Sequence, residues 1–595
     1  MHDTSNEPLA LALAHHQAGR RSAAETLYRQ ILGQEKNNPT ALYLYGCFHF
    51  EDGAIEPAIQ LLRRVVALRP EIAQGQRALA EMLATQLAHV RKLLAAGEAE
   101  EARAALEAIG DPALLAAPLR AEAWFLSGRT AKAFHDFPAA TAAYEQAIAT
   151  APDLAAAWLD LGNCYAETER SEDAERALGK ALAIAPELKE AHASLGSVRL
   201  LAGREAEAEQ SCRAALTIDP EMIAAHQNLA AICAETGRAA EAKTHRDAAY
   251  RQQSLFIEKA ARPDCTVLMP TTAESGNVPW KFLFPRDRAT ILKWFVEYAE
   301  PDAAERLPAY DIVFNGIGDA DAGEAAAAPL KQFLTGCRKP ILNLPQAVAR
   351  TRRDRLADLL DGVADIVVPE VRRLDPAEPA GADVPFPVLL RPCGSHGGTG
   401  VQMIHSATAL AAALGPQQKS WYLTRFYPYS SADGAWRKYR VIFIEGAPFP
   451  YHLAISRHWL VHYVTADMLS DPAKAKEERT FLEDPEIAIG PAGMAALGAI
   501  GARLELDFAG IDFSILPDGR LLVFEANATM LVHPEDEPGP LSYRNAAVRR
   551  ICDAFGAMLR ARLAENSEGT AGRGRRGSYF SQFNQAVAPK IAGAR

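Results

Sequence analysis

A pattern of small residues repeats every 34 positions along the first 255 residues, and no other feature restricts the possible folds so strongly. Gly162 follows Gly128 by one such period and precedes Gly196 by another. The same step relates aligned alanines and prolines, namely Ala140, Ala174 and Ala208, and Pro152, Pro186 and Pro220. Small residues let two helices approach closely, whereas proline cannot continue a helix and marks the turn into the next unit. The pattern predicts an all-α array of stacked helix pairs.

The repeat resembles the tetratricopeptide repeat (TPR), which has the same period. The clearest copy contains Trp158, Leu161, Gly162, Tyr165, Ala174, Ala181 and Pro186. About seven units fit into residues 1–256, one of them degenerate around Gly97 and Ala102. The alternative is an alanine-rich helical bundle, which would not need a fixed period. The resemblance implies a concave groove that binds a peptide or a protein, although a fold alone does not name its ligand.

Length, charge and cysteine content limit the class of protein. A chain of 595 residues exceeds what one hydrophobic core supports, so several domains are expected. The net charge of -11 argues against nucleic acid or an anionic membrane as a general partner. The eight cysteines include no CxxC pair, and the N-terminus lacks a basic start followed by an apolar run. Since no stretch approaches about 18 uninterrupted apolar residues, we expect a cytoplasmic protein without a membrane span.

Strands alternate with helical stretches from Cys265 onward, which is typical of an α/β domain. Four apolar runs that lead into loops indicate strands: DCTVLMP, YDIVFNGIG, KPILNLP and ADIVVPE. Between the last two we expect one helical stretch from Val348 to Leu360. These elements define a predicted domain over residues 264–372.

A glycine-rich loop follows a strand that carries Arg391 near its end. The loop, within LLRPCGSHGGTG, contains Gly394, Gly397, Gly398 and Gly400. Such loops let backbone N–H groups approach an anion, and arginine adds a charged donor. The spacing is not that of a P-loop, because no Lys-Ser/Thr pair ends it and a strand follows it. Taken alone, the segment also fits a plain hairpin loop.

The segment GIDFSILPDGRLLVFEANA predicts a β-hairpin that ends in oxygen-bearing side chains. The turn residues 517–519 indicate a four-residue loop, which places Asp512 opposite Glu525. Because side chains alternate between faces, Asp512, Glu525 and Asn527 share one face, and the other face is apolar. Two carboxylates opposite each other repel, whereas a divalent cation between them reverses the sign of that interaction. Carboxylate and carboxamide oxygens suit Mg²⁺; the alternative is a solvated hairpin end with unrelated acids.

Together these parts resemble the ATP-grasp superfamily, in particular carboxylate–amine ligases of the glutathione synthetase and α-glutamate ligase type. The resemblance covers about Cys265 to Ala564 and depends most on the hairpin. It implies an α/β domain at 264–372 before an α+β ATP-grasp domain at 373–565, which binds ATP and Mg²⁺. The tail at 566–595 is rich in Gly, Arg and Ser and is expected to be disordered.

The resemblance also implies roles for individual residues. The metal ligands would be Asp512, Glu525 and Asn527. The groups that neutralise the transferring phosphoryl group would be Arg440, Arg391 and Lys438. The other nucleotide contacts would be Arg355 from the helical stretch, the four loop glycines, and the hinge strand WYLTRFYPY with Tyr422, Thr424 and Phe426.

A histidine-rich stretch, YHLAISRHWLVHY, lies between the basic strand and the metal hairpin, where the resemblance places acceptor contacts. The candidate substrate residues there are His452, Ser456, Arg457 and His462. A histidine at this place could take a proton from an attacking amine, and the alternative for any single one is a structural role. The following segment, DPAKAKEERTFLEDP, is expected to begin a charged surface helix without a chemical role.

The implied activity is ATP-dependent ligation of a small-molecule or peptide carboxylate to an amine. The carboxylate attacks the γ-phosphate to form an acyl phosphate, and the amine then displaces phosphate. The repeat array would recruit a peptide or protein substrate or partner. Two alternatives stay open. Arginine stands at 355 and 391 where many relatives carry lysine, and the hinge lacks an acidic residue for ribose, which favours an inactive nucleotide-binding scaffold; a phosphotransferase would instead leave the phosphoryl group on its product.

Overall fold

The computed structural model describes residues 6–374, 385–395, 397–414, 420–463 and 465–568. The chain divides into two compact units, Met1–Thr266 with Pro285–Leu307, and Val267–Phe284 with Pro308–Arg595. Residues 285–307, which the sequence analysis placed in the α/β domain, thus pack within the first unit. The expected tail lies outside the described residues from position 569 onward.

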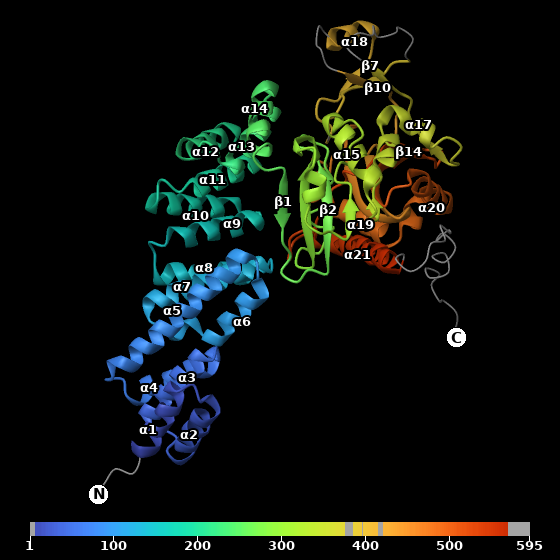
Figure 1. Ribbon diagram of the computed structural model, residues 1–595. Helices are drawn as coiled ribbons and strands as arrows, with labels where there is room; N and C mark the ends of the chain where they lie inside the picture. Colours follow the sequence, from blue (N-terminus) through green and yellow to red (C-terminus); the bar gives the residue numbers. More distant parts are fainter. Residues whose placement is uncertain (1–5, 375–384, 396, 415–419, 464, 569–595) are drawn as a thin grey trace, which may run out of the picture. The chain divides into compact units, whose positions relative to one another are not determined.

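The described part of the first unit contains fourteen α-helices, and consecutive helices pack as pairs that stack in chain order (Figure 1). They are α1 (Asn6–Gln17), α2 (Arg21–Gln34), α3 (Pro39–Glu51), α4 (Ile55–Leu68), α5 (Ala73–Ala96), α6 (Ala99–Ile109), α7 (Ala117–Ala133), α8 (Phe137–Thr150), α9 (Ala155–Glu167), α10 (Ser171–Ile184), α11 (Lys189–Leu201), α12 (Glu205–Ile218), α13 (Ile223–Glu235) and α14 (Ala239–Tyr250). The predicted all-α array of helix pairs is therefore confirmed.

The periodic glycines lie where the two helices of a pair approach most closely. Each faces a side chain of the next helix: Gly46 faces Leu62, Gly128 faces Tyr144, Gly162 faces Leu178 and Gly196 faces Cys212. A Cβ atom added to Gly162 would lie 2.8 Å from Cγ of Leu178, which is closer than two carbon atoms can pack. The small residues of the repeat are thus required by helix packing.

The periodic prolines have a second role that the pattern did not predict. A ring N–H of the next unit donates to the proline carbonyl: Trp158 to Pro152 at 3.0 Å, His192 to Pro186 at 2.9 Å and His226 to Pro220 at 2.9 Å. These bonds satisfy carbonyl groups that a helix cannot use where it ends. The same hydrogen bond therefore fixes the turn at the equivalent position of three successive units.

An aromatic cluster ends the first unit and explains why residues 285–307 belong to it. Strand β1 (Leu255–Glu258) pairs antiparallel with β3 (Ala289–Phe295). The ring of Tyr250, the last residue of α14, lies 4.1 Å from that of Phe295 and 5.6 Å from that of Tyr298. The hydroxyl group of Tyr298 also donates to Asp247 at 2.9 Å.

The second unit begins with an α/β part. Strands β2 (Cys265–Thr271), β4 (Ile312–Phe314) and β5 (Ile341–Leu342) pair in parallel, and α15 (Glu324–Gly336) lies between β4 and β5 in the chain. Three of the four expected strands therefore form here. The fourth, ADIVVPE, forms β6 (Ile366–Val367), which pairs with a different sheet.

The expected continuous helix from Val348 to Leu360 is wrong. The segment forms α16 (Pro345–Arg350), a 3₁₀ turn at Arg353–Arg355 and α17 (Leu356–Leu359). The hydroxyl group of Thr351 donates back to the carbonyl of Val348, and Arg352 has extended backbone angles (φ -55°, ψ 137°). The break rotates the residues after it relative to a continuous helix, and this decides which arginine points inward.

Two largely antiparallel sheets complete the second unit. The four-stranded sheet has the order β7-β10-β8-β9 and is accompanied by α18 (Ala407–Leu414). Its strands are β7 (Val371–Leu374), β8 (Val388–Pro392), β9 (Gln402–Ile404) and β10 (Trp421–Arg425). The five-stranded sheet has the order β12-β11-β13-β14-β6. Its antiparallel strands are β11 (Trp436–Ile444), β12 (Ala447–Ser456), β13 (Phe508–Ile515) and β14 (Leu521–Asn527).

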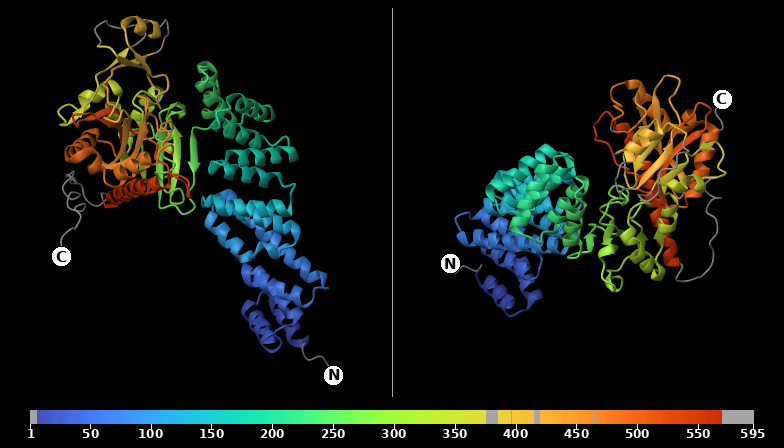
Figure 2. Two further views of the ribbon diagram at one scale, coloured as in Figure 1. Left: turned by 180° about the vertical axis from the view of Figure 1, so that it is seen from behind. Right: turned by 90° about the horizontal axis from the view of Figure 1, so that it is seen from above.

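Helices pack against the five-stranded sheet and bury its core. They are α19 (Pro472–Glu483), α20 (Pro485–Leu504) and α21 (Asn545–Glu568), and Figure 2 shows α21 beside the strands. Among the described residues, one helix, α20, has the length and the apolar composition that would allow it to cross a membrane. Several of its apolar side chains, among them Ile489, Leu497 and Ile500, are buried in the same core as β11 and β13, and Gly490 interrupts its helical backbone. Core packing therefore accounts for one face of this helix.

Candidate functional site

The hairpin β13–β14 places two carboxylates directly opposite each other. Asp512 pairs with Glu525, as predicted, although the loop differs from the expected one. Ile515 pairs with Leu521, so the loop is one residue longer than expected. A β-bulge at Phe524 shifts the register back by one residue. The bulge thus brings the two acids face to face.

Asp512 is buried among basic side chains of β11, with 1% of its surface exposed. Arg440 donates to it through two nitrogens at 2.7 and 3.0 Å, and the ammonium group of Lys438 lies 3.0 Å from Oδ2. Burial alone would raise the pKa of Asp512, but Arg440 and Lys438 hold that pKa well below its usual range. Lys438 and Arg440, two residues apart on β11, therefore reach the same carboxylate.

Glu525 receives its basic partners from two other elements. Arg353 of the 3₁₀ turn donates to Oε2, and Arg391 of β8 lies 3.8 Å from the same oxygen. Burial would raise the pKa of Glu525, but Arg353 and Arg391 lower it. Arg355, the predicted phosphate contact, is exposed instead. The helix break after Arg350 is the reason, because it turns Arg353 rather than Arg355 toward the carboxylate.

Asn527 lines a cavity beside these two carboxylates. Its Oδ1 accepts hydrogen bonds from the amide and the hydroxyl group of Thr529, both at 2.9 Å. The cavity is lined by residues 319–321, 351–353, Gly394, Ser395 and Asn527. Asp319 and Asp321 were not predicted, and their only signal in the sequence is their position after the strand YDIVFNGIG.

The glycine-rich loop has a left-handed backbone conformation that residues with a side chain rarely adopt. All four of its glycines have φ between 62° and 81°. Arg391 is held against the start of the loop, since its Nε donates to the hydroxyl group of Ser395 at 3.1 Å and another nitrogen donates to the Ser395 carbonyl. Further along, a Cβ atom on Gly397 would lie 3.4 Å from Nε2 of His462. The loop therefore connects Arg391 to the histidine-rich stretch.

Strand β10 lies next to β8, the strand that carries Arg391. Tyr422 pairs with Arg391 in register, and its hydroxyl group donates to Asp321 at 2.6 Å. Thr424 is half-buried on the same strand, and the ring of Phe426 lies 6.0 Å from that of Trp459. The structure therefore brings Tyr422 to the cavity, while Phe426 packs against the histidine-rich stretch.

The four candidate substrate residues separate into two pairs. His452 of β12 pairs in register with Arg440 of β11. His462 lies close enough to Lys438 and Arg440 that these charges, together with burial, lower its pKa. Ser456 and Arg457 instead stabilise the local loop, since Ser456 accepts from the amide of His458 at 3.0 Å and Arg457 donates to the carbonyl of Asp433 at 2.8 Å. Only the two histidines lie near the basic cluster.

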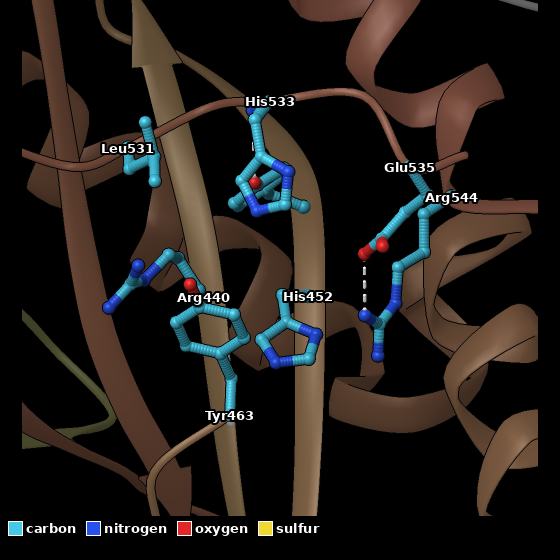
Figure 3. Close-up of a pocket in the computed structure, with 8 residues that line it drawn as sticks. Arg440, His452, Tyr463, Leu531, His533, Glu535 and Arg544 are labelled. Carbon is cyan, nitrogen blue, oxygen red and sulfur yellow. Dashed lines mark hydrogen bonds and ion pairs between the residues drawn. The ribbon is translucent and has the colours of Figure 1, made fainter. Parts of the chain in front are cut away.

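A second cavity adjoins Arg440 and His452, which pair across β11 and β12 (Figure 3). It is lined by Arg440, Tyr451, His452, Tyr463, Leu531, His533, Glu535 and Arg544. Figure 3 shows His452 between Tyr463 and the ion pair of Glu535 with Arg544. The cavity thus combines aromatic walls with charged groups.

The segment 471–485 was expected to begin a charged surface helix; it forms α19, and one of its acids, Glu478, faces inward instead. This residue of α19 is completely buried and bonds His452, Tyr543 and Arg544. Burial would raise its pKa, but His452 and Arg544 lower the pKa of Glu478 to about 2. The sequence did not single out Glu478, because it is one of many charged residues in this helix and composition does not show which of them faces inward.

The donor set of the hairpin fits a magnesium ion by its chemistry. In the described residues there is no group of three or more His, Cys, Asp or Glu side chains suited to a metal. The predicted set has only two carboxylates, Asp512 and Glu525, and Asn527 would supply a carboxamide oxygen. Carboxylate and carboxamide oxygens are hard ligands, and Mg²⁺ commonly takes only one or two protein carboxylates together with phosphate oxygens and water.

Comparison with known proteins gives a match within the first unit. The sequence model of the tetratricopeptide repeat matches residues 15–82 and 131–197. The N-terminal half is accordingly a TPR-like helical array, and a mixed α/β region follows it.

Similar solved structures include MamA from MSR-1, with 25% identity over 28% of this chain and 90% of its own, at a TM-score of 0.24. The Pseudomonas aeruginosa protein pilF has 18% identity over 29% of this chain and 77% of its own, at a TM-score of 0.26. No curated protein matches the chain.

Proposed function

We propose that the protein is an ATP-dependent carboxylate–amine ligase whose TPR array recruits a peptide or protein substrate or partner. The observation that carries the proposal is the buried pair Asp512–Glu525, which four basic side chains surround. These are Arg353, Arg391, Lys438 and Arg440.

An alternating cluster of acids and bases suits a magnesium–triphosphate complex. The carboxylates and Asn527 would hold Mg²⁺, and the basic groups would turn to phosphate oxygens. The four basic groups exceed the two carboxylates by two positive charges, which suits a polyphosphate that brings more negative charge than the metal ion neutralises. Bound Mg²⁺ would supply charge neutralisation at the transferring phosphoryl group.

The remaining residues would orient the reactants and exclude water. Arg391, tied to Ser395 at the mouth of the glycine loop, would bind a phosphate through its fork. The loop would then cover the acyl phosphate, which must react with the amine before water hydrolyses it. Arg440 would neutralise the negative charge that develops on the phosphate as it leaves.

The test is turnover by the full chain with MgATP, pooled carboxylates and pooled amines. A ligase releases ADP and free phosphate and forms a condensed product that mass spectrometry detects, and Glu525→Gln stops all three. A phosphorylated product would indicate a phosphotransferase instead. Tight MgATP binding without any turnover would favour an inactive scaffold and contradict the proposal.

A further inference from the structure

The cavity beside Arg440 contains a histidine that is held in one orientation with one nitrogen unused. Nδ1 of His452 lies 2.5 Å from Oε1 of Glu478. Because the carboxylate of Glu478 can only accept, Nδ1 carries the proton and Nε2 has the free electron pair. Nε2 is buried and has no hydrogen-bond partner among the described residues. Buried polar atoms are rarely left unpaired, so this atom is available to a ligand.

Glu478 is fixed from several sides and therefore acts as a rigid support. The amide of Leu453 donates to Oε1 at 3.1 Å, and Arg544 donates to Oε2 at 2.9 Å. The hydroxyl group of Tyr543 donates to the same Oε2 at 2.5 Å. A carboxylate with this many donors stays ionised and holds the imidazole ring in place.

The charges around the cavity suit a positively charged ligand. Arg544 is shared between Glu478 and Glu535, so this group carries one net negative charge. The charge of Arg440 is compensated by a bidentate pair with Asp512, and in the proposed reaction phosphate would compensate it instead. The ring of Tyr463 lies 5.4 Å from the ring of His452 and that of Tyr451 lies 6.5 Å from it, and His533 also lines the cavity. An ammonium group is also favoured by aromatic walls.

We propose that this cavity binds the amine substrate as a small primary ammonium ion, and that His452 is the general base that deprotonates it, with Glu478 as a positioning residue. This inference rests on the proposed ligase function. Burial also lowers the pKa of His452, which keeps the ring neutral and ready to accept a proton.

His452 lies next to the residues proposed to bind the phosphate, which suits a proton transfer from the amine during its attack. His452 pairs with Arg440 across β11 and β12, and Arg440 pairs with Asp512 across β11 and β13. One proton of the ammonium ion passes to Nε2, and the amine nitrogen then attacks the carbonyl carbon of the acyl phosphate. The C–N bond forms, the bond from carbon to the phosphate oxygen breaks, and phosphate leaves with the electron pair and takes the second nitrogen proton.

The first test follows chemistry with two nucleophiles and the pooled carboxylates that support ADP formation. Hydroxylamine is unprotonated at neutral pH and traps an acyl phosphate without a base, whereas methylammonium requires one. We expect His452→Asn to retain hydroxamate formation but to lose methylamide formation by about a hundredfold at pH 7, recovering as the pH rises. His405→Asn, an exposed matched control, retains both rates.

Unchanged methylamide formation with the wild-type pH profile in His452→Asn would overturn the inference alone. Absence of hydroxamate from the wild type would overturn the proposed ligase function and this inference together. If His452→Asn does not fold, His452→Gln is measured in the same way.

The second test does not depend on turnover. In the full chain labelled with ¹⁵N-histidine, we expect the Nε2 signal of His452 to be that of an unprotonated nitrogen at pH 7 and to shift when methylammonium chloride is added. A protonated Nε2, or a signal that methylammonium leaves unchanged, would contradict the proposed base.

Discussion

Asp512 and Glu525 face each other across β13 and β14 because a bulge at Phe524 corrects a hairpin loop that would otherwise put them out of register. A pair of buried carboxylates is costly unless positive charge compensates it. Arg440 and Lys438 compensate one acid, and the two arginines from other elements compensate the other. The relationship therefore joins three parts of the second unit around one pair of acids.

The structure distinguishes two arginines that lie two positions apart. Arg353→Ala should weaken MgATP binding about tenfold to hundredfold, because it removes a buried charged donor. Arg355→Ala should leave the affinity unchanged, since its side chain is exposed. Calorimetric titration of both variants with MgATP measures the difference. Equal losses in the two variants, or a loss confined to Arg355→Ala, would show that the continuous helix expected from the sequence is the better description.

The helix packing of the repeats predicts opposite effects for two nearby glycines. Gly162→Ala should lower the free energy of unfolding of the array by about 1–3 kcal/mol, because the new methyl group overlaps Leu178. Gly179→Ala, in α10, meets no atom within 4 Å and should raise it by about 0.5–1 kcal/mol through helix propensity. Urea unfolding followed by circular dichroism compares them. A variant of Gly162 as stable as the wild type would exclude the close approach.

The buried Glu478 predicts a loss of stability in acid. Its pKa falls from the ordinary 4.5 to about 2, so its ionised form contributes about 3 kcal/mol above pH 4.5, and this contribution disappears as the pH falls toward 2. Protonation of His452 acts in the same direction, because its lowered pKa makes the unfolded state the better proton acceptor. Glu478→Gln should be less stable than the wild type at pH 7, and the two should converge in acid.

Hydrogen exchange of segment 447–456 during urea titration reports this difference locally, since the amide of Leu453 donates to Glu478. A constant difference between the two proteins from pH 7 to pH 3 would mean that the carboxylate is not ionised by its partners. The matched control is Asp518→Asn, because Asp518 pairs with Arg520 on the exposed surface. The stability of this variant should not converge with that of the wild type in acid.

Local patterns predicted the parts of this protein that depend on neighbouring residues in the chain. The period of Gly162 and its equivalents predicted the helix array. The turn residues predicted the pairing of Asp512 with Glu525, although a longer loop and a bulge compensate for each other to give it. The break at Arg352 and the bulge at Phe524 could not be predicted, because both depend on contacts with distant elements. Glu478 was missed for the same reason, since its partners His452 and Arg544 lie on a strand and a turn that the helix composition does not reveal.

The most direct test of the proposed function is whether Asp512 and Glu525 bind a cation that is shared with a nucleotide. Mn²⁺ can replace Mg²⁺, and its electron spin resonance spectrum with the full chain and ATP reports both the bound ion and its coupling to ³¹P. We predict that the wild type binds Mn²⁺ together with ATP, with a resolved ³¹P coupling, and that Glu525→Gln weakens this binding at least about tenfold. A wild type that binds no Mn²⁺ in the presence of ATP, or a variant with the same affinity and coupling, would contradict the account.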